Sequence, residues 1–235
     1  MDPAPIQFEP IAEDALLLRF GERMDAALNE RVRAAVLTLR HQLPRFEYIP
    51  AYASVLMRFD PLACHGATIS SHEALQREVL AALGKGEALI HALREQEIPV
   101  CYRGAYGPDL PQVAQYLDLP IDEVITRHVS AEYQVAMIGF APGFPYLLGL
   151  DPALAMPRRR DPRQRVPAGS VGIGGVQSGI YPDQLPGGWQ LIGRTPLRLF
   201  DATATPPSLL AAGDLVRFRA IDENEFRHLE AEQLR

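Results

Sequence analysis

The chain has 235 residues, of which 47% are hydrophobic and 22% are charged, as expected for one large or two small globular domains. Its net charge of −6 and isoelectric point near 5.5 argue against a general nucleic-acid binder, which usually carries a basic surface. No apolar run approaches the roughly 18 residues that span a bilayer, and the N-terminal segment MDPAPIQFEP has no secretory-signal pattern, so we expect a cytoplasmic protein.

The N-terminal part of the chain is predicted to alternate between strands and helices. Apolar residues at every second position indicate strands, and apolar residues with a period of 3.6 indicate helices. Pro44 is expected to end the first helix. A capping box is expected to open the second helix. The elements in order are a strand within 8–20, a helix over 25–43, strands over 46–49 and 54–59, a helix opening at Ser70 and Glu73, and a strand over 97–102. This β-α-β-β-α-β order is the ferredoxin-like pattern.

The composition shifts after Arg103, where two short helices precede a region with mainly strand and turn signals. Asp109 is expected to cap the first of these helices. The predicted elements are helices over 109–117 and 121–129, strands over 132–140, 190–192, 197–200 and 215–220, and a charged helix over 222–233. This pattern is typical of a small barrel. The fold class is therefore α+β, with domains 1–97 and 98–235.

Residues 139–194 form an unusual stretch that holds most of the glycines, eight of the 21 prolines and the only tryptophan. Flexible linkers lack large apolar anchors, but this stretch keeps five aromatic side chains. They are Phe140, Phe144, Tyr146, Tyr181 and Trp189. We therefore expect short strands and ordered loops that carry binding groups.

Several well-known catalytic patterns are missing from the sequence. It contains no P-loop, no GxSxG nucleophile elbow and no HExxH zinc motif. Cys64 and Cys101 are far apart and are predicted to be free thiols. The chain thus shows no complete catalytic set, and we predict no metal or organic cofactor bound by it alone.

A few side chains are nevertheless candidates for chemistry. His128 lies close to Glu132 and could act as an acid or base near neutral pH, or it could simply favour the dipole of a helix C-terminus. Five arginines between 158 and 165 could bind anions through their planar forks, or keep a loop solvated. They are Arg158, Arg159, Arg160, Arg163 and Arg165.

Four further candidates come from the later motifs. Gln177 and Tyr181 could present an amide and a phenol to a polar ligand, or belong to a turn with a packed tyrosine. Trp189 is more readily explained as a core residue than as a ligand platform. Arg194 could contact an anion or make a salt bridge.

Three pieces of the chain resemble a known family. They are RHVSAEYQVAMIGFAPGFPYLLGL at 127–150, PR–RVPAGSVGIGG–QSGIYP within 162–182, and PGGWQLIGRTPLRLFD at 186–201. The family is that of the 5-oxoprolinase B subunits, also called the KipI or allophanate hydrolase subunit 1 family. The resemblance implies a ferredoxin-like N-terminal domain and a cyclophilin-like β-barrel domain.

The resemblance also implies that the chain works as part of a hetero-oligomer. In this family, the B subunit pairs with a carboxyltransferase-like C subunit. With a LamB/YcsF-like A subunit, the set opens 5-oxo-L-proline to L-glutamate, and we assign ATP with magnesium to that complex. Two alternatives stay open: a non-catalytic, KipI-like inhibitor of a sensor histidine kinase, and the carboxyltransferase part of a urea carboxylase or allophanate system.

Lactam opening that depends on ATP needs cations for phosphoryl oxygens, polar groups for the lactam and a base. We therefore predict His128 as acid or base, Gln177 and Tyr181 as polar contacts, and Arg165 and Arg194 as anion contacts. The site is expected at the barrel mouth, completed by a partner protein.

Overall fold

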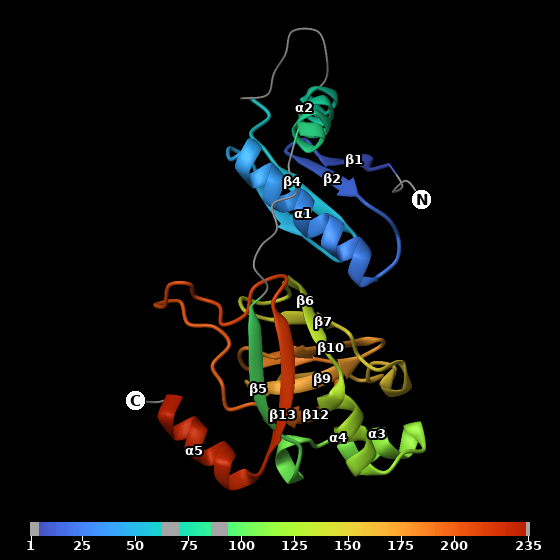
Figure 1. Cartoon of the computed structure of the whole chain (residues 1–235), viewed down its shortest axis with the longest axis vertical. Helices are drawn as coiled ribbons and strands as arrows, with labels where there is room; N and C mark the ends of the chain where they lie inside the picture. Colours follow the sequence, from blue (N-terminus) through green and yellow to red (C-terminus); the bar gives the residue numbers. More distant parts are fainter. Residues whose placement is uncertain (1–4, 63–70, 86–93, 234–235) are drawn as a thin grey trace. The chain divides into compact units, whose positions relative to one another are not determined.

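The computed structural model describes residues 5–62, 71–85 and 94–233 (Figure 1). Contacts within the chain divide it into two compact units, Met1–Ala92 and Leu93–Arg235. The predicted domains 1–97 and 98–235 differ slightly from these units, and the domain assignment stays a prediction.

The N-terminal unit is a four-stranded antiparallel sheet with two helices. Its elements are β1 (Gln7–Ala12), β2 (Ala15–Arg19), α1 (Ala26–Gln42), β3 (Glu47–Pro50), β4 (Ser54–Arg58) and α2 (Ser71–Lys85). The sheet order is β1-β2-β4-β3. Alternate residues of β2, including Leu16 and Leu18, pack against the apolar stripe of α1 that contains Val32 and Leu39. Asp25 caps α1 by accepting a hydrogen bond from the backbone N–H of Leu28 at 2.8 Å.

Two strand predictions for this unit need correction. The expected single strand within 8–20 is a hairpin, because Ala12 pairs with Ala15 across a two-residue turn. The strand predicted at 97–102 belongs to β5 (Glu95–Cys101), which pairs with strands of the second unit. The described elements therefore follow a ββαββα order in place of the predicted βαββαβ order. The predicted capping residue Ser70 lies outside the described residues.

The second unit is built around a closed seven-stranded barrel with the order β10-β7-β6-β13-β5-β12-β9. Besides β5, its strands are β6 (Tyr133–Ile138), β7 (Pro145–Leu148), β9 (Ser170–Gly174), β10 (Gln177–Ile180), β12 (Gln190–Arg194) and β13 (Leu215–Ile221). Strands β5 and β13 are parallel, and every other neighbouring pair is antiparallel. The α+β class and the barrel are thus confirmed.

The remaining elements cover the barrel or flank it. They are the 3-10 turns η1 (Gly104–Tyr106) and η2 (Pro152–Leu154), helices α3 (Leu110–Leu117), α4 (Ile121–Ser130) and α5 (Glu223–Gln233), and a two-stranded ribbon of β8 (Arg163–Val166) and β11 (Leu185–Gly187). Helix α4 packs against β13, α3 against β12 and α5 against β5 (Figure 1). The strand predicted over 197–200 is reduced to one bridge between Phe200 and Ser208, since Pro206 and Pro207 next to it have no N–H to donate.

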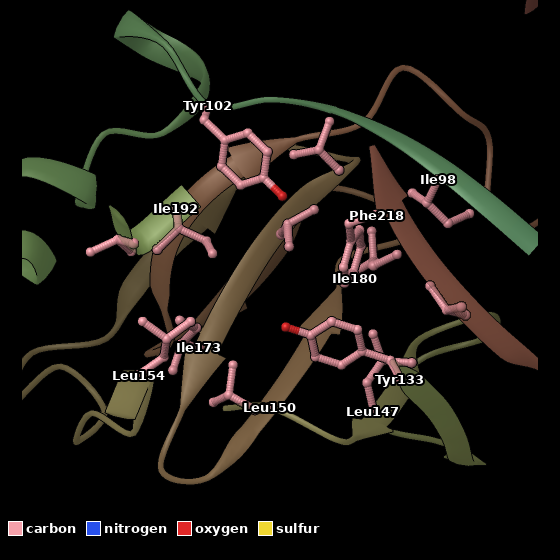
Figure 2. Close-up of a cluster of buried hydrophobic side chains, with 14 of the residues drawn as sticks. Ile98, Tyr102, Tyr133, Leu147, Leu150, Leu154, Ile173, Ile180, Ile192 and Phe218 are labelled. Carbon is pink, nitrogen blue, oxygen red and sulfur yellow. The ribbon is translucent and has the colours of Figure 1, made fainter. Parts of the chain in front are cut away.

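Side chains from every strand of the barrel fill its interior. Figure 2 shows Ile98, Ile173, Ile180, Ile192 and Phe218 converging on one apolar cluster, with tyrosine hydroxyls among them. The barrel is therefore a packed core and not a pore. Among residues 5–62, 71–85 and 94–233, no helix has the length and apolarity needed to cross a membrane.

Candidate functional site

A second apolar cluster lies on the outside of the barrel, where glycines replace larger residues in its wall. Gly174 of β9 and Gly179 of β10 lie against Trp189, and a Cβ atom on Gly174 would come within 2.6 Å of the indole ring. Only glycine permits so close an approach. The glycine-rich sequence of these two strands therefore makes room for the tryptophan. The cluster contains Phe144, Val166, Tyr181, Trp189 and Leu191.

A hollow of about 190 Å³ opens over this cluster, and we call it the aromatic groove. Its walls come from three stretches that are far apart in the sequence. They are Phe140, Phe144 and Tyr146, then Arg158, Arg159 and Pro162, then Tyr181, Pro186, Gly187, Gly188 and Trp189. The groove thus gathers the aromatic residues of the stretch 139–194. It is concave and mostly apolar with a few polar groups, as small-molecule sites usually are.

Phe140 is the unusual member of the groove. It is 60% exposed and has a φ of 68°, a backbone conformation that bulky residues rarely adopt. Its ring meets those of Phe144 and Tyr181 edge to face, with centroids 5.4 Å and 6.4 Å apart. A large apolar side chain that is both strained and exposed favours a binding role, since such strain is concentrated at ligand sites.

Arg158 supplies the positive charge of the groove. Its guanidinium carbon lies 5.6 Å from the centroid of the Trp189 ring, a cation–π arrangement. Within the described part of the chain, no carboxylate pairs with Arg158. Burial raises the pKa of both Tyr146 and Tyr181, and the nearby charge of Arg158 opposes that rise. Two phenol hydroxyls and one available guanidinium therefore lie close together.

His128, the predicted acid or base, lies in the barrel interior with 0% exposure. The hydroxyl of Tyr102 is 2.8 Å from its Nδ1 atom, and the hydroxyl of Ser178 is 3.3 Å from its Nε2 atom. Burial lowers its pKa from 6.5 to about 3. The imidazole is therefore neutral and enclosed, an environment that favours a structural role.

The other predicted residues are dispersed over the second unit. Tyr181 lines the aromatic groove, whereas Gln177 is buried in β10 and Arg165 is exposed on β8. Arg194 donates from Nε to the carbonyl of Ala168 at 2.7 Å, and its guanidinium lies 5.8 Å from the Phe226 ring. The structure thus brings only Tyr181, of the five predicted residues, to the groove.

Sequence reasoning missed two features of this site. Trp189 is buried, as expected of a core residue, but its ring also forms a wall of the groove. Asp109, predicted as a helix cap, occupies the N-cap position of α3 without a capping hydrogen bond. Its carboxylate accepts from Arg163 at 2.6 and 2.9 Å and from Arg159 at 3.3 Å. The only sequence signal for these contacts was the density of arginines between 158 and 165.

The described residues contain no group of three or more His, Cys, Asp or Glu side chains that could hold a metal ion.

The chain resembles known proteins over most of its length. A model of the family described as "Carboxyltransferase domain, subdomain C and D" matches residues 6–210. The 5-oxoprolinase B subunit of Bacillus subtilis (strain 168) is 44% identical over 227 residues, which cover 94% of this chain and 95% of that protein. The 5-oxoprolinase B subunit of Escherichia coli O157:H7 is 55% identical over 134 residues, covering 57% of this chain and 62% of that protein.

Solved structures resemble the chain as well. The crystal structure of TTHA0988 is 37% identical to this chain, with a TM-score of 0.75. The match covers 88% of this chain and 40% of TTHA0988, so this chain spans about two fifths of that protein. PH0987 from Pyrococcus horikoshii, 41% identical, aligns over 94% of this chain and 100% of its own with a TM-score of 0.56. Urea carboxylase from Kluyveromyces lactis shares the fold, with a TM-score of 0.74 at 23% identity over 99% of this chain and 23% of its own.

The resemblance named from the motifs is thus confirmed, since both the family match and the Bacillus subtilis relative extend over most of the chain. This chain belongs to the carboxyltransferase-domain family of subdomains C and D and, within it, to the 5-oxoprolinase B subunits.

Proposed function

We propose that this chain is an obligate B subunit of an ATP-dependent 5-oxoprolinase, which cleaves 5-oxo-L-proline to L-glutamate together with the A and C subunits. The observation that carries the proposal is the 44% identity to a 5-oxoprolinase B subunit over 94% of the chain. An identity of that size, spread over both units, supports a shared role and not only a shared fold.

The chemistry of the aromatic groove is compatible with this substrate. 5-Oxo-L-proline combines a flat lactam ring with a carboxylate. The rings of Phe140 and Trp189 offer apolar faces for the lactam ring. The guanidinium of Arg158 offers a charged fork for the carboxylate, and the hydroxyl of Tyr181 offers a polar contact. We therefore place this chain's part of the substrate site at the groove.

The other predicted site residues keep a place in the proposal only where their positions allow it. Arg165 is exposed on the β8–β11 ribbon and is a candidate anion contact for a ligand presented by a partner protein. Gln177, Arg194 and His128 already make contacts within the fold. His128 would act as an acid or base only if the barrel opened, since its side chain has no exposure.

The remaining features of the proposal concern the complex. We assign ATP and its magnesium ion to the assembly, whose other members are a LamB/YcsF-like A subunit plus a carboxyltransferase-like C subunit. Arg158, without a carboxylate partner in the described chain, also fits a phosphoryl oxygen. The barrel is proposed to be cyclophilin-like, and the assembly is expected in the cytoplasm.

The test is ATP-dependent release of glutamate from 5-oxoproline, measured with this chain alone and with candidate A and C subunits. We expect turnover only in the complete mixture. A mixture lacking this chain is the control for activity of the other proteins. An assembled complex without turnover would contradict the proposal.

A second candidate is the carboxyltransferase part of a urea carboxylase or allophanate system. The family description and the fold shared with urea carboxylase favour it. It predicts transfer of a carboxyl group from carboxybiotin to urea, with no glutamate formed from 5-oxoproline. The third reading, a KipI-like kinase inhibitor, predicts neither reaction, so the two assays separate all three.

A further inference from the structure

The arginines between 158 and 165 fall into two sets with different surroundings. Arg159 and Arg163 are paired with Asp109, whose side chain is 5% exposed. The same carboxylate accepts the backbone N–H of Leu191 at 2.7 Å, so it is tied to β12 as well as to the arginines. Arg158 remains at the groove without a carboxylate partner in residues 5–62, 71–85 and 94–233.

The backbone is fixed on both sides of Arg158. The side-chain amide of Gln190 donates to the carbonyl of Pro157 at 3.0 Å. The backbone N–H of Arg159 donates to the carbonyl of Gly188 at 2.6 Å. Both partners flank Trp189, the ring beneath the Arg158 guanidinium. The segment that carries Arg158 is thus attached to the segment that carries the groove wall.

We propose that Asp109 is a positioning residue: with Arg159 and Arg163 it holds the 157–163 segment so that Arg158 can bind the carboxylate of a small ring-containing acid in the aromatic groove. The identity of that acid as 5-oxoproline rests on the proposed function. The arrangement of Asp109, the arginines and the groove is independent of the proposed function.

The charge of the cluster supports this division of roles. One carboxylate and two guanidiniums leave a net charge of +1, and Arg158 adds another beside the groove, so the local field attracts an anion. The Nε atom of Arg159 is buried without a hydrogen-bond partner, although Arg159 lines the groove. A buried donor without an acceptor needs an explanation, and a bound carboxylate would supply one.

Trp189 provides the assay, because it is the only tryptophan of the chain and lies at the site. Its fluorescence is measured while 5-oxoproline is added to the full chain, and in parallel while 2-pyrrolidone, the lactam without the carboxylate, is added. We expect saturable binding of 5-oxoproline and much weaker binding of 2-pyrrolidone. Arg158→Gln should weaken 5-oxoproline binding about tenfold or more, because a charge-assisted contact is lost.

Arg160→Gln is the matched control, since Arg160 is exposed in the same segment and outside the groove lining. It should change the affinity less than about twofold, as surface charges contribute little. Equal affinity of 5-oxoproline and 2-pyrrolidone, or equal losses in the two variants, would overturn the inference.

Asp109→Asn tests the positioning role. It should weaken 5-oxoproline binding in the natural chain but add little in the Arg158→Gln background, because residues that act through one another are not additive. Equal losses in both backgrounds would mean that Asp109 acts independently of Arg158. Arg163→Lys keeps the charge but loses the bidentate fork, and it gives the same test if Asp109→Asn does not fold.

The reconstituted complex separates this inference from the proposed function. For Asp109→Asn we expect a higher KM for 5-oxoproline with a smaller change in kcat. Binding to the chain without turnover in the complex would refute the proposed function and leave the groove assignment intact. Turnover in the complex without any response of Trp189 in the chain, or an unchanged KM in Arg158→Gln, would overturn the groove assignment alone.

Discussion

Replacing His128 with glutamine should remove a large pH dependence from the stability of the barrel. The neutral imidazole fits its surroundings in one arrangement. Nδ1 accepts from the Tyr102 hydroxyl, Nε2–H donates to Ser178, and the Ser178 hydroxyl donates to the carbonyl of Gly172 at 3.3 Å. A proton on Nδ1 would leave the Tyr102 O–H without its acceptor and place a buried charge without a counterion among these partners.

The size of the effect follows from the pKa. In the folded chain the pKa of His128 is lowered to about 3, whereas the unfolded value is near 6.5. Below pH 6.5 the unfolded state therefore binds a proton that the folded state does not, and stability falls as the pH falls towards 3. At about 1.36 kcal/mol per unit, the loss is roughly 2 kcal/mol at pH 5 and about 4 kcal/mol at pH 3.

The assay is urea unfolding of the chain and of His128→Gln at pH values between 7.5 and 5. The variant should be less stable at pH 7.5, since it loses ring contacts with Tyr133 and Phe218. Its stability should then fall less between pH 7.5 and 5 than that of the natural chain, by about 2 kcal/mol. Carboxylate effects are common to both proteins and cancel in the difference. Parallel pH profiles, or an NMR titration of His128 near pH 6.5, would refute the reasoning.

Three further predictions concern the groove and the N-terminal unit. Gly174→Ala should lower the unfolding free energy of the barrel by about 1–3 kcal/mol, because its Cβ would meet the indole at 2.6 Å. The control Gly84→Ala should not lower the unfolding free energy, because a Cβ there has no atom within 4 Å. Phe140→Gly should keep or raise Tm by relieving the positive φ, and it should still weaken 5-oxoproline binding; a clear loss of Tm would contradict the strain argument. Asp25→Ala should lower the unfolding free energy by about 1 kcal/mol, and no change would mean that the cap is dispensable.

The helices could be predicted from sequence because their signals are local. Helix α1 begins after its cap Asp25 and ends before Pro44, and α3 and α4 agree with prediction to within a residue or so. The partner of β5 could not be predicted in this way. The sequence of a strand shows which of its faces is buried but not which sheet it joins. The segment EIPVCY at 97–102 was therefore compatible with the sheet of either unit.

The aromatic groove was only partly predictable for a similar reason. The glycines, prolines and aromatic residues of the stretch 139–194 predict ordered loops with binding groups, and this stretch supplies the groove walls. The sequence does not show which carboxylate pairs with Arg159 and Arg163. Asp109 is far from Arg159 and Arg163 in the sequence, and its local context favoured a helix cap. Ion pairs between distant segments have no local signature.

The alternation of β10 places neighbouring residues of the motif QSGIYP on opposite faces of the barrel wall. Ser178 points into the barrel, where it meets His128, so its neighbour Gly179 must face outward, where it lies against Trp189. The motif QSGIYP therefore serves two environments that the barrel wall separates. Its inner side chains fix the packing of β10, and this packing places the glycine against which the groove is built. A change at His128 should consequently reach the groove through the position of β10 and not through contact with a ligand.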